Sequence, residues 1–357
     1  MSDFLSLHDF VTAARRRLAQ GEWDYLTGAA ETETSLRRNR MGLESLAFRP
    51  RVLNDVSDVD ATTTLLGSRL RIPVVLAPLG SIQLFDDEGA AGVARAAGEF
   101  GTVMILSSVC LPEFEEVAEI GTGPKIYQLY LYGDWDWMDD IIARTIQSGY
   151  VALCLTADTQ VYSRRERDIA KRWVPRSALR TVTTDIGWQA RMSWATVEHI
   201  KSTFDIPLVI KGINTAEDAR RAVDAGVEVV YVSNHGGRQL DHARACIDSL
   251  AEVATAVAGQ VPVIVDGGFM RGTDVLKAIC LGAAAVGIGR LEGLALAAGG
   301  EPALLRMLEL LEIEIRTNMA LMGVRNLADL DPSLVVPAPP LPDPQVLSGF
   351  PLLDQGY

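Results

Sequence analysis

Six apolar, strand-like segments of this 357-residue chain end in side chains that can carry out chemistry. A single polar residue after a strand means little. The carboxyl ends of parallel barrel strands converge on one mouth, however, so six such ends predict one active site. In chain order the residues are Gln128 and Tyr130; Thr156 and Asp158; Lys211; Ser233, Asn234, His235, Arg238 and Asp241; Asp266, Gly267 and Gly268; and Gly287, Gly289 and Arg290.

His235 is the only one of the four histidines that follows a strand-like segment. Two glycines and then Arg238 come after it, so a possible base lies near a guanidinium group that can bind an anion through two hydrogen bonds. Asp158 is expected to orient the imidazole and stabilise its protonated form. The alternative for Asp158 is an ordinary helix N-cap. The pattern indicates acid–base chemistry on an anionic substrate.

Glycines after the last two strand-like segments, with Arg290 beside them, suit a phosphate pocket, because glycine lets backbone N–H groups approach phosphate oxygens. Glycine also serves tight turns, so this signal is weak by itself. Lys211 ends an apolar strand and needs an anionic partner there. That partner is either a carboxylate at the mouth of the barrel or an anionic, electron-accepting ring.

Eight strand-like segments alternate with helical patterns and must position these residues. Most of the strands are apolar throughout, as parallel strands covered on both faces are. Eight such units favour a (β/α)8 TIM barrel over a doubly wound open sheet, and no GxGxxG follows the first strand. The strands are expected at 74–78, 102–106, 125–130, 151–156, 207–212, 229–233, 262–267 and 284–289, and the helices at 88–99, 112–119, 135–148, 194–203, 215–225, 246–258, 272–281 and 301–320.

The remaining segments complete a single expected domain over 1–357. Residues 1–70 are interpreted as an N-terminal cap of two short helices and a capping strand or hairpin, before a barrel over 71–322. The proline-rich tail, 323–357, is expected to be extended on the surface or on a neighbouring subunit. The long connection 157–193 carries Trp173 and Trp188 and is expected to act as a lid on the face of the active site.

Composition excludes several classes of protein. The chain is 48% hydrophobic and 22% charged, which is ordinary for a globular protein. A net charge of −13 argues against a nucleic-acid partner. Cys110, Cys154, Cys246 and Cys280 form no CxxC pair, so neither a disulfide framework nor a metal site is expected, and a cytoplasmic protein is indicated. No segment approaches the ~18 apolar residues of a membrane span.

Ordered motifs extend along most of the chain. They are YLTGAAETETSLRRNR, FRPRVL, IPVVLAP, LSS, YQLY, LTAD, RRERD, LVIKG, SNHGGRQLD, DGGFMRGTDVLKAICLGAAAVGIGR and TNMALMG. Together they resemble the FMN-dependent α-hydroxy-acid oxidase and dehydrogenase family, which includes glycolate oxidase, lactate oxidase and mandelate dehydrogenase. The resemblance implies a TIM barrel holding FMN. It implies oxidation of a small (S)-2-hydroxy acid to the 2-oxo acid, with electrons passing to FMN and then to O2 or another acceptor. It also suggests a homo-oligomer, a tetramer or an octamer.

The resemblance also implies roles for individual residues. His235 would be the base, paired with Asp158. The substrate carboxylate would be held by Arg238, Arg165, Tyr25 and Tyr130. Lys211 would lie by the N1–C2=O edge of the flavin. Ser107, Gln128 and Thr156 would form hydrogen bonds with the flavin ring, and the backbone of Pro78, Leu79 and Gly80 would run along it. Ser233 is also expected to contact the cofactor. The residues expected at the ribityl chain and phosphate are Asp266, Gly267, Gly268, Met270, Gly289 and Arg290.

Three residues depart from the pattern of that family. Val109 stands where several members carry a tryptophan, which predicts a wider pocket that accepts an aryl substrate. Gln160 replaces a usual proline in a shortened connection, which predicts an open site suited to a carrier-linked substrate. Met270 replaces a usual phosphate-binding arginine, and Arg271 is expected to point elsewhere. One lost charged contact is worth about 1.5–3 kcal/mol, so weaker retention of FMN is predicted.

Two alternatives from other functional classes remain open. A non-redox FMN barrel, such as an isomerase of phosphorylated substrates, would keep the cofactor loops but would not be expected to keep both His235 and Arg238. A catalytically silent binding subunit would explain Val109 and Met270. The sequence also leaves open whether the base removes the α-proton or the hydroxyl proton.

Overall fold

Eight parallel strands close into a barrel in the computed structural model, which describes residues 4–174, 187–341 and 343–355. The TIM-barrel prediction is therefore confirmed, and the open-sheet alternative is wrong because the first and last strands pair with each other. The strands are β4 Val74–Leu76, β5 Met104–Ser107, β6 Lys125–Leu129, β7 Ala152–Thr156, β8 Leu208–Ile213, β9 Val229–Val232, β10 Val263–Val265 and β11 Ala285–Ile288.

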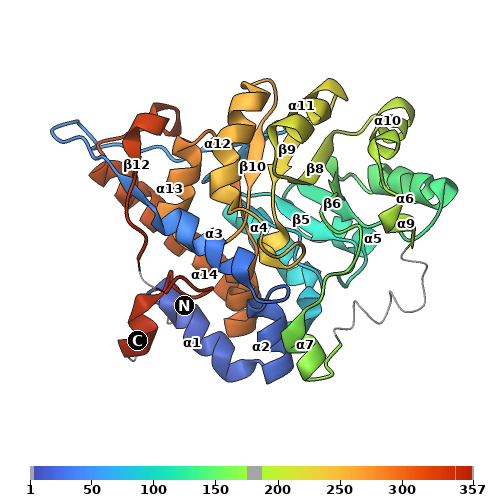
Figure 1. Cartoon of the computed structure of the whole chain (residues 1–357), viewed down its shortest axis with the longest axis horizontal. Helices are drawn as coiled ribbons and strands as arrows, with labels where there is room; N and C mark the ends of the chain where they lie inside the picture. Colours follow the sequence, from blue (N-terminus) through green and yellow to red (C-terminus); the bar gives the residue numbers. More distant parts are fainter. Residues whose placement is uncertain (1–3, 175–186, 342, 356–357) are drawn as a thin grey trace.

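Helices surround the barrel (Figure 1). Their bounds are α4 Ala90–Phe100, α5 Phe114–Ala118, α6 Trp135–Gln147, α10 Trp194–Thr203, α11 Ala216–Asp224, α12 Cys246–Val257, α13 Gly272–Cys280 and α14 Arg290–Leu321. All eight predicted helices are present. The last begins at Arg290 rather than at 301, and its backbone breaks at Gly299 and Gly300. That break, with Pro302 beyond it, hides the first part of the helix from a sequence pattern.

A short hairpin closes the amino-terminal end of the barrel. Strands β2 Thr63–Leu65 and β3 Ser68–Leu70 pair antiparallel. The side chains of Leu65 and Leu70 are buried in the same apolar cluster as interior residues such as Ile105 and Tyr231. This hairpin matches the expected capping element. Since one end of the barrel is plugged by apolar side chains, a ligand must enter at the other end, where the strands finish.

The amino-terminal cap has three helices, α1 Leu7–Arg17, α2 Gln20–Thr27 and α3 Thr34–Glu44, so the expectation of two is corrected. Helix α1 buries Leu7, Phe10, Val11 and Ala14, a spacing typical of one helical face, and packs on α14. Helix α2 spans only eight residues and has no such pattern, which is why the sequence did not separate it. It brings Tyr25 to the mouth of the barrel.

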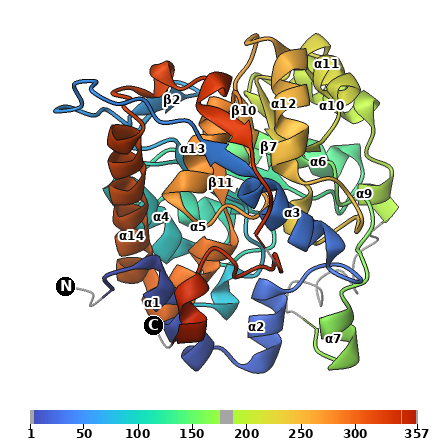
Figure 2. The same ribbon diagram turned by 60° about the vertical axis from the view of Figure 1, so that its left-hand side comes forward.

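The carboxyl-terminal tail folds back on its own chain. Strand β12 Val335–Pro337 pairs antiparallel with β1 Leu46–Phe48, and the red and blue strands lie side by side in Figure 2. Farther along, the ring of Phe350 is buried, and its centroid lies 5.4 Å from that of His8. Of the two expected positions for the tail, the structure therefore shows the one on the surface of the same chain.

The long connection after β7 contains α7 Glu166–Ala170 and α9 Gly187–Ala190. Helix α7 is tied to the cap by ion pairs, Lys171 with Asp24 and Arg167 with Glu33 (2.5 Å). The ring of Trp173 lies 5.5 Å from that of Tyr25. Residues 175–186, part of the predicted lid, lie outside the described residues.

Candidate active site

The main pocket opens at the carboxyl ends of the barrel strands, where the sequence predicts it. Most of the predicted site residues line it: Tyr25, Pro78, Leu79, Gly80, Tyr130, Arg165, Lys211, His235, Arg238, Asp266, Gly267, Gly268, Met270, Gly289 and Arg290. Gly287 also lines it, whereas Ser107, Gln128, Thr156, Asp158 and Ser233 do not and lie at or just after the ends of β5, β6, β7 and β9. Asn234 and Asp241 were expected at the same mouth but lie outside the lining, where they accept hydrogen bonds from Asn39 (2.9 Å) and Ser35 (2.7 Å) of helix α3.

His235 is held by two side chains from the end of β7. Its Nδ1 atom lies 3.0 Å from Oδ1 of Asp158 and 3.1 Å from Oγ1 of Thr159, and that hydroxyl also donates to Asp158 (2.9 Å). Since these contacts engage Nδ1, the ring nitrogen left for a ligand is Nε2. Asp158 therefore orients the imidazole and does not serve as the helix N-cap considered above.

The backbone of His235 adopts a left-handed conformation, with φ of +56°. A non-glycine residue rarely has a positive φ, and such strain persists only where the surroundings impose it. Here the N–H of His235 donates to Oγ of Ser233 (3.0 Å), and Gly236 (φ +63°) continues the turn. A Cβ on Gly236 would stand 2.5 Å from Nη1 of Arg290, so a larger residue here would both strain the backbone and displace that guanidinium.

The surroundings of His235 favour its neutral form. Burial lowers its pKa below the usual 6.5, and the positive charges of Lys211 and Arg165 act in the same direction, against the opposing charge of Asp158. For Asp158, burial raises the pKa, but His235, Lys211 and the hydrogen bond from Thr159 outweigh it, so the net shift is downward. A neutral imidazole beside an ionised carboxylate is a general base at neutral pH.

Lys211 projects from β8 into a buried network of hydrogen bonds. Its Nζ donates to Oγ of Ser233 (2.7 Å) and lies 3.4 Å from Oδ2 of Asp266, while the Ser233 hydroxyl donates to Oδ1 of Asp266 (2.7 Å). Burial lowers the pKa of Lys211, but Asp266 and Asp158 more than compensate and raise it. The ammonium group is therefore charged and held in place at the floor of the pocket.

Two arginines and a tyrosine form one wall of the pocket. The guanidinium carbon of Arg238 lies 4.6 Å from the ring centre of Tyr25, and that of Arg165 lies 5.8 Å from it. The Tyr25 hydroxyl donates to the carbonyl of Gly80 (3.2 Å). Burial, and then the charge of Arg165, lower the pKa of Arg238. An anion bound between the two guanidinium groups would relieve that repulsion.

Arg290 lies at the start of α14, beside the glycines that follow β10 and β11. It donates to the carbonyls of Leu26 (3.2 Å) and Gly28 (2.8 Å). Burial and the charge of Arg238 lower its pKa to about 9. The start of a helix and a crowded guanidinium together make a site for an anionic group such as a phosphate.

Polar atoms at the ends of β6 and β7 are buried without a partner. The amide nitrogen of Gln128 and the hydroxyl of Thr156 have no hydrogen-bond partner among the described residues, although Gln128 accepts from Ser107 (2.8 Å). Leaving such a group unsatisfied costs about 1–3 kcal/mol. With the cations described above, these atoms fit a ligand that has a flat polar edge and a phosphate, as FMN has.

Met270 is buried in the loop that follows β10, and its neighbour Arg271 points away from the pocket, as predicted. The Arg271 guanidinium pairs with Glu314 (2.5 Å) and donates to the carbonyl of Gly349 (3.2 Å). Arg40 supports the loop from behind, since it donates to the carbonyl of Gly268 (2.7 Å). None of these contacts places a second guanidinium where Met270 lines the pocket.

Sequence reasoning missed several residues of the pocket. Thr159 touches both members of the His235–Asp158 pair. Tyr162 stacks under Arg165, at 4.3 Å from ring centre to guanidinium carbon. The buried side chain of Gln189 links the carboxyl ends of β6 and β7. Its oxygen accepts a hydrogen bond from the N–H of Leu131 (2.8 Å), and its nitrogen donates to the carbonyl of Thr156 (3.0 Å). Only the position of Thr159 directly after Asp158 was a usable signal.

Three further features concern the part of the chain that the structure covers. No group of three or more histidine, cysteine, aspartate or glutamate side chains is arranged for a metal ion among the described residues. None of the described helices combines the length and the apolarity needed to cross a bilayer. All four cysteines are buried and unpaired.

Comparisons with known proteins agree with this geometry. The model of a family described as FMN-dependent dehydrogenase matches residues 14–337. A peroxisomal (S)-2-hydroxy-acid oxidase of Oryza sativa subsp. japonica is 42% identical over 350 residues, 93% of this chain and 96% of the relative. Glycolate oxidase of Spinacia oleracea is 37% identical over 93% of this chain and 95% of its own length. A crystal structure of mandelate oxidase, 37% identical, superposes with a TM-score of 0.87 over 95% of this chain and 99% of its own.

Proposed function

The chain belongs to the FMN-dependent dehydrogenase family, and from that membership we propose that it oxidises an (S)-2-hydroxy acid to the corresponding 2-oxo acid. The observation that carries this proposal is a neutral histidine, His235, held by a carboxylate and facing a pocket whose walls supply two guanidinium groups. When bound, FMN accepts the two electrons released from the substrate and passes them to O2 or another acceptor.

His235 and Asp158 handle the proton in this proposal. Oxidation of an alcohol carbon to a ketone removes two protons and two electrons in all, and His235 takes up one of the protons at Nε2. Asp158 stabilises the resulting imidazolium, while Thr159 fixes the ring orientation. A positioned base of this kind contributes about 10²–10⁴ in rate.

Arg238 and Arg165 bind the carboxylate of the substrate in this proposal, and the hydroxyls of Tyr25 and Tyr130 complete its coordination. Burial, with the negative charge of Asp158, raises the pKa of Tyr130 well above its usual value. That phenol is therefore a hydrogen-bond donor over the whole working range of pH. The two guanidinium groups fix which end of the acid faces His235, and so which carbon is oxidised.

Residues on the strand ends would hold FMN. Lys211 supplies a fixed positive charge for the pyrimidine edge of the ring, and Gln128 and Thr156 have the free polar atoms for it. Ser107 and Ser233 support these groups through hydrogen bonds to Gln128 and Lys211. The backbone of residues 78–80 would run along the ring. The phosphate and ribityl chain would contact Asp266, Gly267, Gly268, Met270, Gly289 and Arg290.

Finer properties also belong to the proposal. We infer that the pocket accepts aryl or carrier-linked acids. Both Val109 and Gln160 line it, and Val109 is smaller than the tryptophan found there in several family members, while Gln160 is more polar than the usual proline. A cytoplasmic location is supported by the four unpaired cysteines. We also infer a tetramer or octamer, and this rests on membership of the family alone.

Anaerobic reduction of the bound flavin tests the proposed function. The purified protein, supplemented with FMN, is mixed with a panel of (S)-2-hydroxy acids from glycolate to aryl acids, and its visible spectrum is recorded. Bleaching of the oxidised-flavin band by one class of acid is the expected result. A bound flavin that no member of the panel reduces would contradict the proposal and favour the non-redox barrel. A protein that binds no FMN would favour the silent subunit.

A further inference from the structure

We propose that the C2 substituent of the hydroxy acid passes Val109 and enters a second cavity, the side cavity, so that the preferred substrate carries a long aliphatic or arylalkyl chain. This inference rests on the proposed function and specifies its substrate class. The apolar and aromatic part of the lining of the side cavity includes Val109, Phe114, Tyr127, Leu129, Tyr132 and Trp137, and its polar part includes Ser107, Ser108, Glu113 and Arg144.

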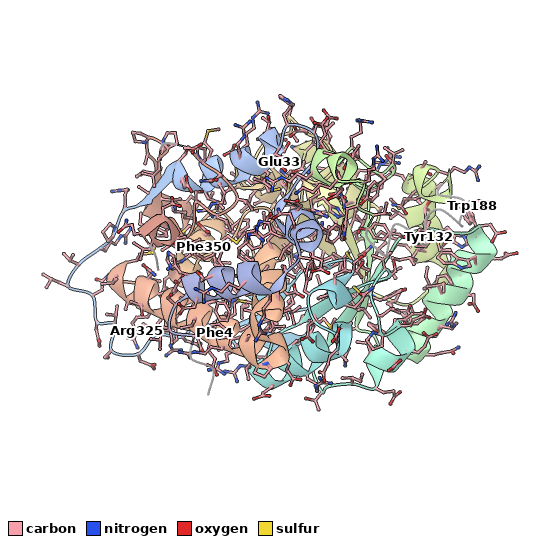
Figure 3. All side chains as sticks on the ribbon, turned by 90° about the horizontal axis from the view of Figure 1, so that it is seen from below. Phe4, Glu33, Tyr132, Trp188, Arg325 and Phe350 are labelled. Carbon is pink, nitrogen blue, oxygen red and sulfur yellow. The ribbon has the colours of Figure 1, made fainter. Side chains whose placement is uncertain are left out.

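The side cavity lies where β5 and β6 end and where helices α5 and α6 cover them. Its volume is about 350 Å³. An apolar cavity of ~150 Å³ already accommodates benzene, so the side cavity can hold a phenyl ring or a chain of several carbons. In Figure 3 the label of Tyr132 marks this side of the molecule, far from Phe350 and the carboxyl-terminal tail.

Val109 stands between the side cavity and the reacting groups. Val109 and Tyr132 line both cavities. A methyl of Val109 lies 2.9 Å from where a Cβ on Gly80 would be, and the Tyr25 hydroxyl lies 3.7 Å from the same point. Val109 is thus next to the corner where the substrate carboxylate is proposed to bind, and the side cavity begins behind it.

Aromatic rings continue from the main pocket into the side cavity. The ring of Tyr130, at the main pocket, lies 6.5 Å from that of Tyr132, which lies 6.3 Å from that of Trp137. On the opposite wall, the rings of Phe114 and Tyr127 are 4.7 Å apart. Aromatic faces of this kind favour an apolar or aryl group over a hydrated one.

Two charged residues, Glu113 and Arg144, line the side cavity. Arg144 lies with its guanidinium carbon 5.2 Å from the ring centre of Phe114, and it forms ion pairs with Glu115 and with Asp140 (3.2 Å). Its charge is therefore balanced by carboxylates of the same chain. This favours an uncharged chain over one that ends in a second carboxylate.

The inference predicts how affinity depends on chain length. Burial of one methylene is worth about fourfold in affinity, so binding should tighten by about that factor for each carbon that enters the side cavity. Glycolate and lactate, whose substituents are too short to pass Val109, should gain nothing from it. The substrate concentration that gives half the maximal rate of flavin reduction reports this dependence.

Two substitutions fill the side cavity from different sides. Val109→Trp blocks its entrance, and Ile141→Trp fills it from α6. Ile146→Trp is the matched control, because Ile146 lies on the same helix but is 38% exposed and lines neither cavity. The experiment measures anaerobic flavin reduction by stopped flow for straight-chain (S)-2-hydroxy acids of increasing length and for aryl and arylalkyl acids, in the FMN-loaded protein and each variant.

We expect long or arylalkyl acids to bind at least tenfold more tightly than lactate. This difference in affinity should disappear in Val109→Trp and in Ile141→Trp but persist in Ile146→Trp. Reduction by lactate should stay within about twofold in Ile146→Trp, and an unchanged visible spectrum of bound FMN in every variant shows that each is folded. Equal affinity for short and long acids, or a length dependence that survives in both filled variants, would overturn the inference while the proposed function stands. Failure of every acid to reduce the flavin would overturn both.

Discussion

The Nδ1 atom of His235, after β9, lies 3.0 Å from Oδ1 of Asp158, after β7, although 77 residues separate them in the chain. Strand β8 runs between β7 and β9, and the positive charge of its Lys211 lowers the pKa of both members of the pair. The contact fixes one imidazole nitrogen and leaves the other facing the pocket. The position of the base is therefore set by the closed barrel and not by a local motif.

Replacing His235 with glutamine should lower the rate of flavin reduction by about 10²–10⁴, because the proton acceptor is lost while the hydrogen-bonding shape is partly kept. Stopped-flow reduction by the best substrate measures the change. FMN should stay bound. The control is His242→Gln, since His242 is exposed and its replacement should leave the rate unchanged. Normal reduction in His235→Gln would refute the assignment of the base.

The pH dependence of reduction should report the neutral form of His235. Burial lowers the pKa of His235 below 6.5, so the protonated, inactive form prevails only at acidic pH. At limiting substrate, the rate should rise with pH through that lowered pKa and be level at neutral pH. In Asp158→Asn the carboxylate no longer raises the pKa of His235, so the rise should shift to lower pH and the plateau should drop. A rise centred above pH 6.5 would contradict this interpretation.

Thr159 is predicted to act as a positioning residue. Its hydroxyl contacts both His235 and Asp158, so Thr159→Val should lower the reduction rate about tenfold by loosening the imidazole. Thr159→Ser keeps the hydroxyl and should restore most of the rate. The effect should appear in the maximal rate of reduction and not in the affinity for substrate. A reduction rate in Thr159→Val equal to that of the unchanged protein would show that the hydroxyl does not position the imidazole.

Arg290 should control the retention of FMN. Loss of one charged contact to a phosphate, about 1.5–3 kcal/mol, corresponds to roughly 10- to 150-fold weaker binding in Arg290→Met. Recovery of flavin fluorescence after dilution of the holoprotein measures the release. Arg271→Met is the matched control, because Arg271 pairs with Glu314 outside the pocket. Faster release in Arg271→Met than in Arg290→Met would show that the neighbour of Met270 holds the phosphate instead.

Glu292 should make the fold less stable as the pH rises. Its side chain is buried near the start of α14, and burial raises its pKa well above the usual 4.5. The folded state holds a proton that the unfolded state releases above pH 4.5, so stability falls as pH increases from there. Glu292→Gln should raise the melting temperature at pH 8 by about 1–3 °C, given ~1 °C per kcal/mol in a chain of this size. The two proteins should have the same melting temperature near pH 4. A Glu292→Gln variant that melts at a lower temperature than the unchanged protein at pH 8 would contradict the prediction.

The barrel could be predicted because its strands are continuous apolar runs whose ends are polar. Each strand can be identified from its local sequence alone. Closure of the barrel then brings His235, Lys211 and Asp266 together at one end. The break in α14 and the short helix α2 could not be predicted, since glycines interrupt the first and the second has no apolar face.

Other features depend on distances between side chains that no local pattern encodes. The bridge from Thr159 to His235 requires the exact placement of two strand ends that lie 76 residues apart. The side cavity depends on how helices α5 and α6 sit over β5 and β6. The burial of Glu292 depends on packing against the rest of the barrel, whereas its sequence context resembles an ordinary first turn of a helix.

The pairing of β1 with β12 has a consequence for the order of folding. Leu46 pairs with Pro337, so this contact joins two segments that lie on either side of the whole barrel in the sequence. Such a contact stabilises the chain only after the entropic cost of closing the long segment between its partners has been met. Gly349 accepts a hydrogen bond from Arg271, and Ser348 donates to Glu44, so the wall behind the loop after β10 depends on the same long-range docking of the tail. On refolding, we expect this wall to form after the barrel, and binding of added FMN to lag behind the recovery of secondary structure.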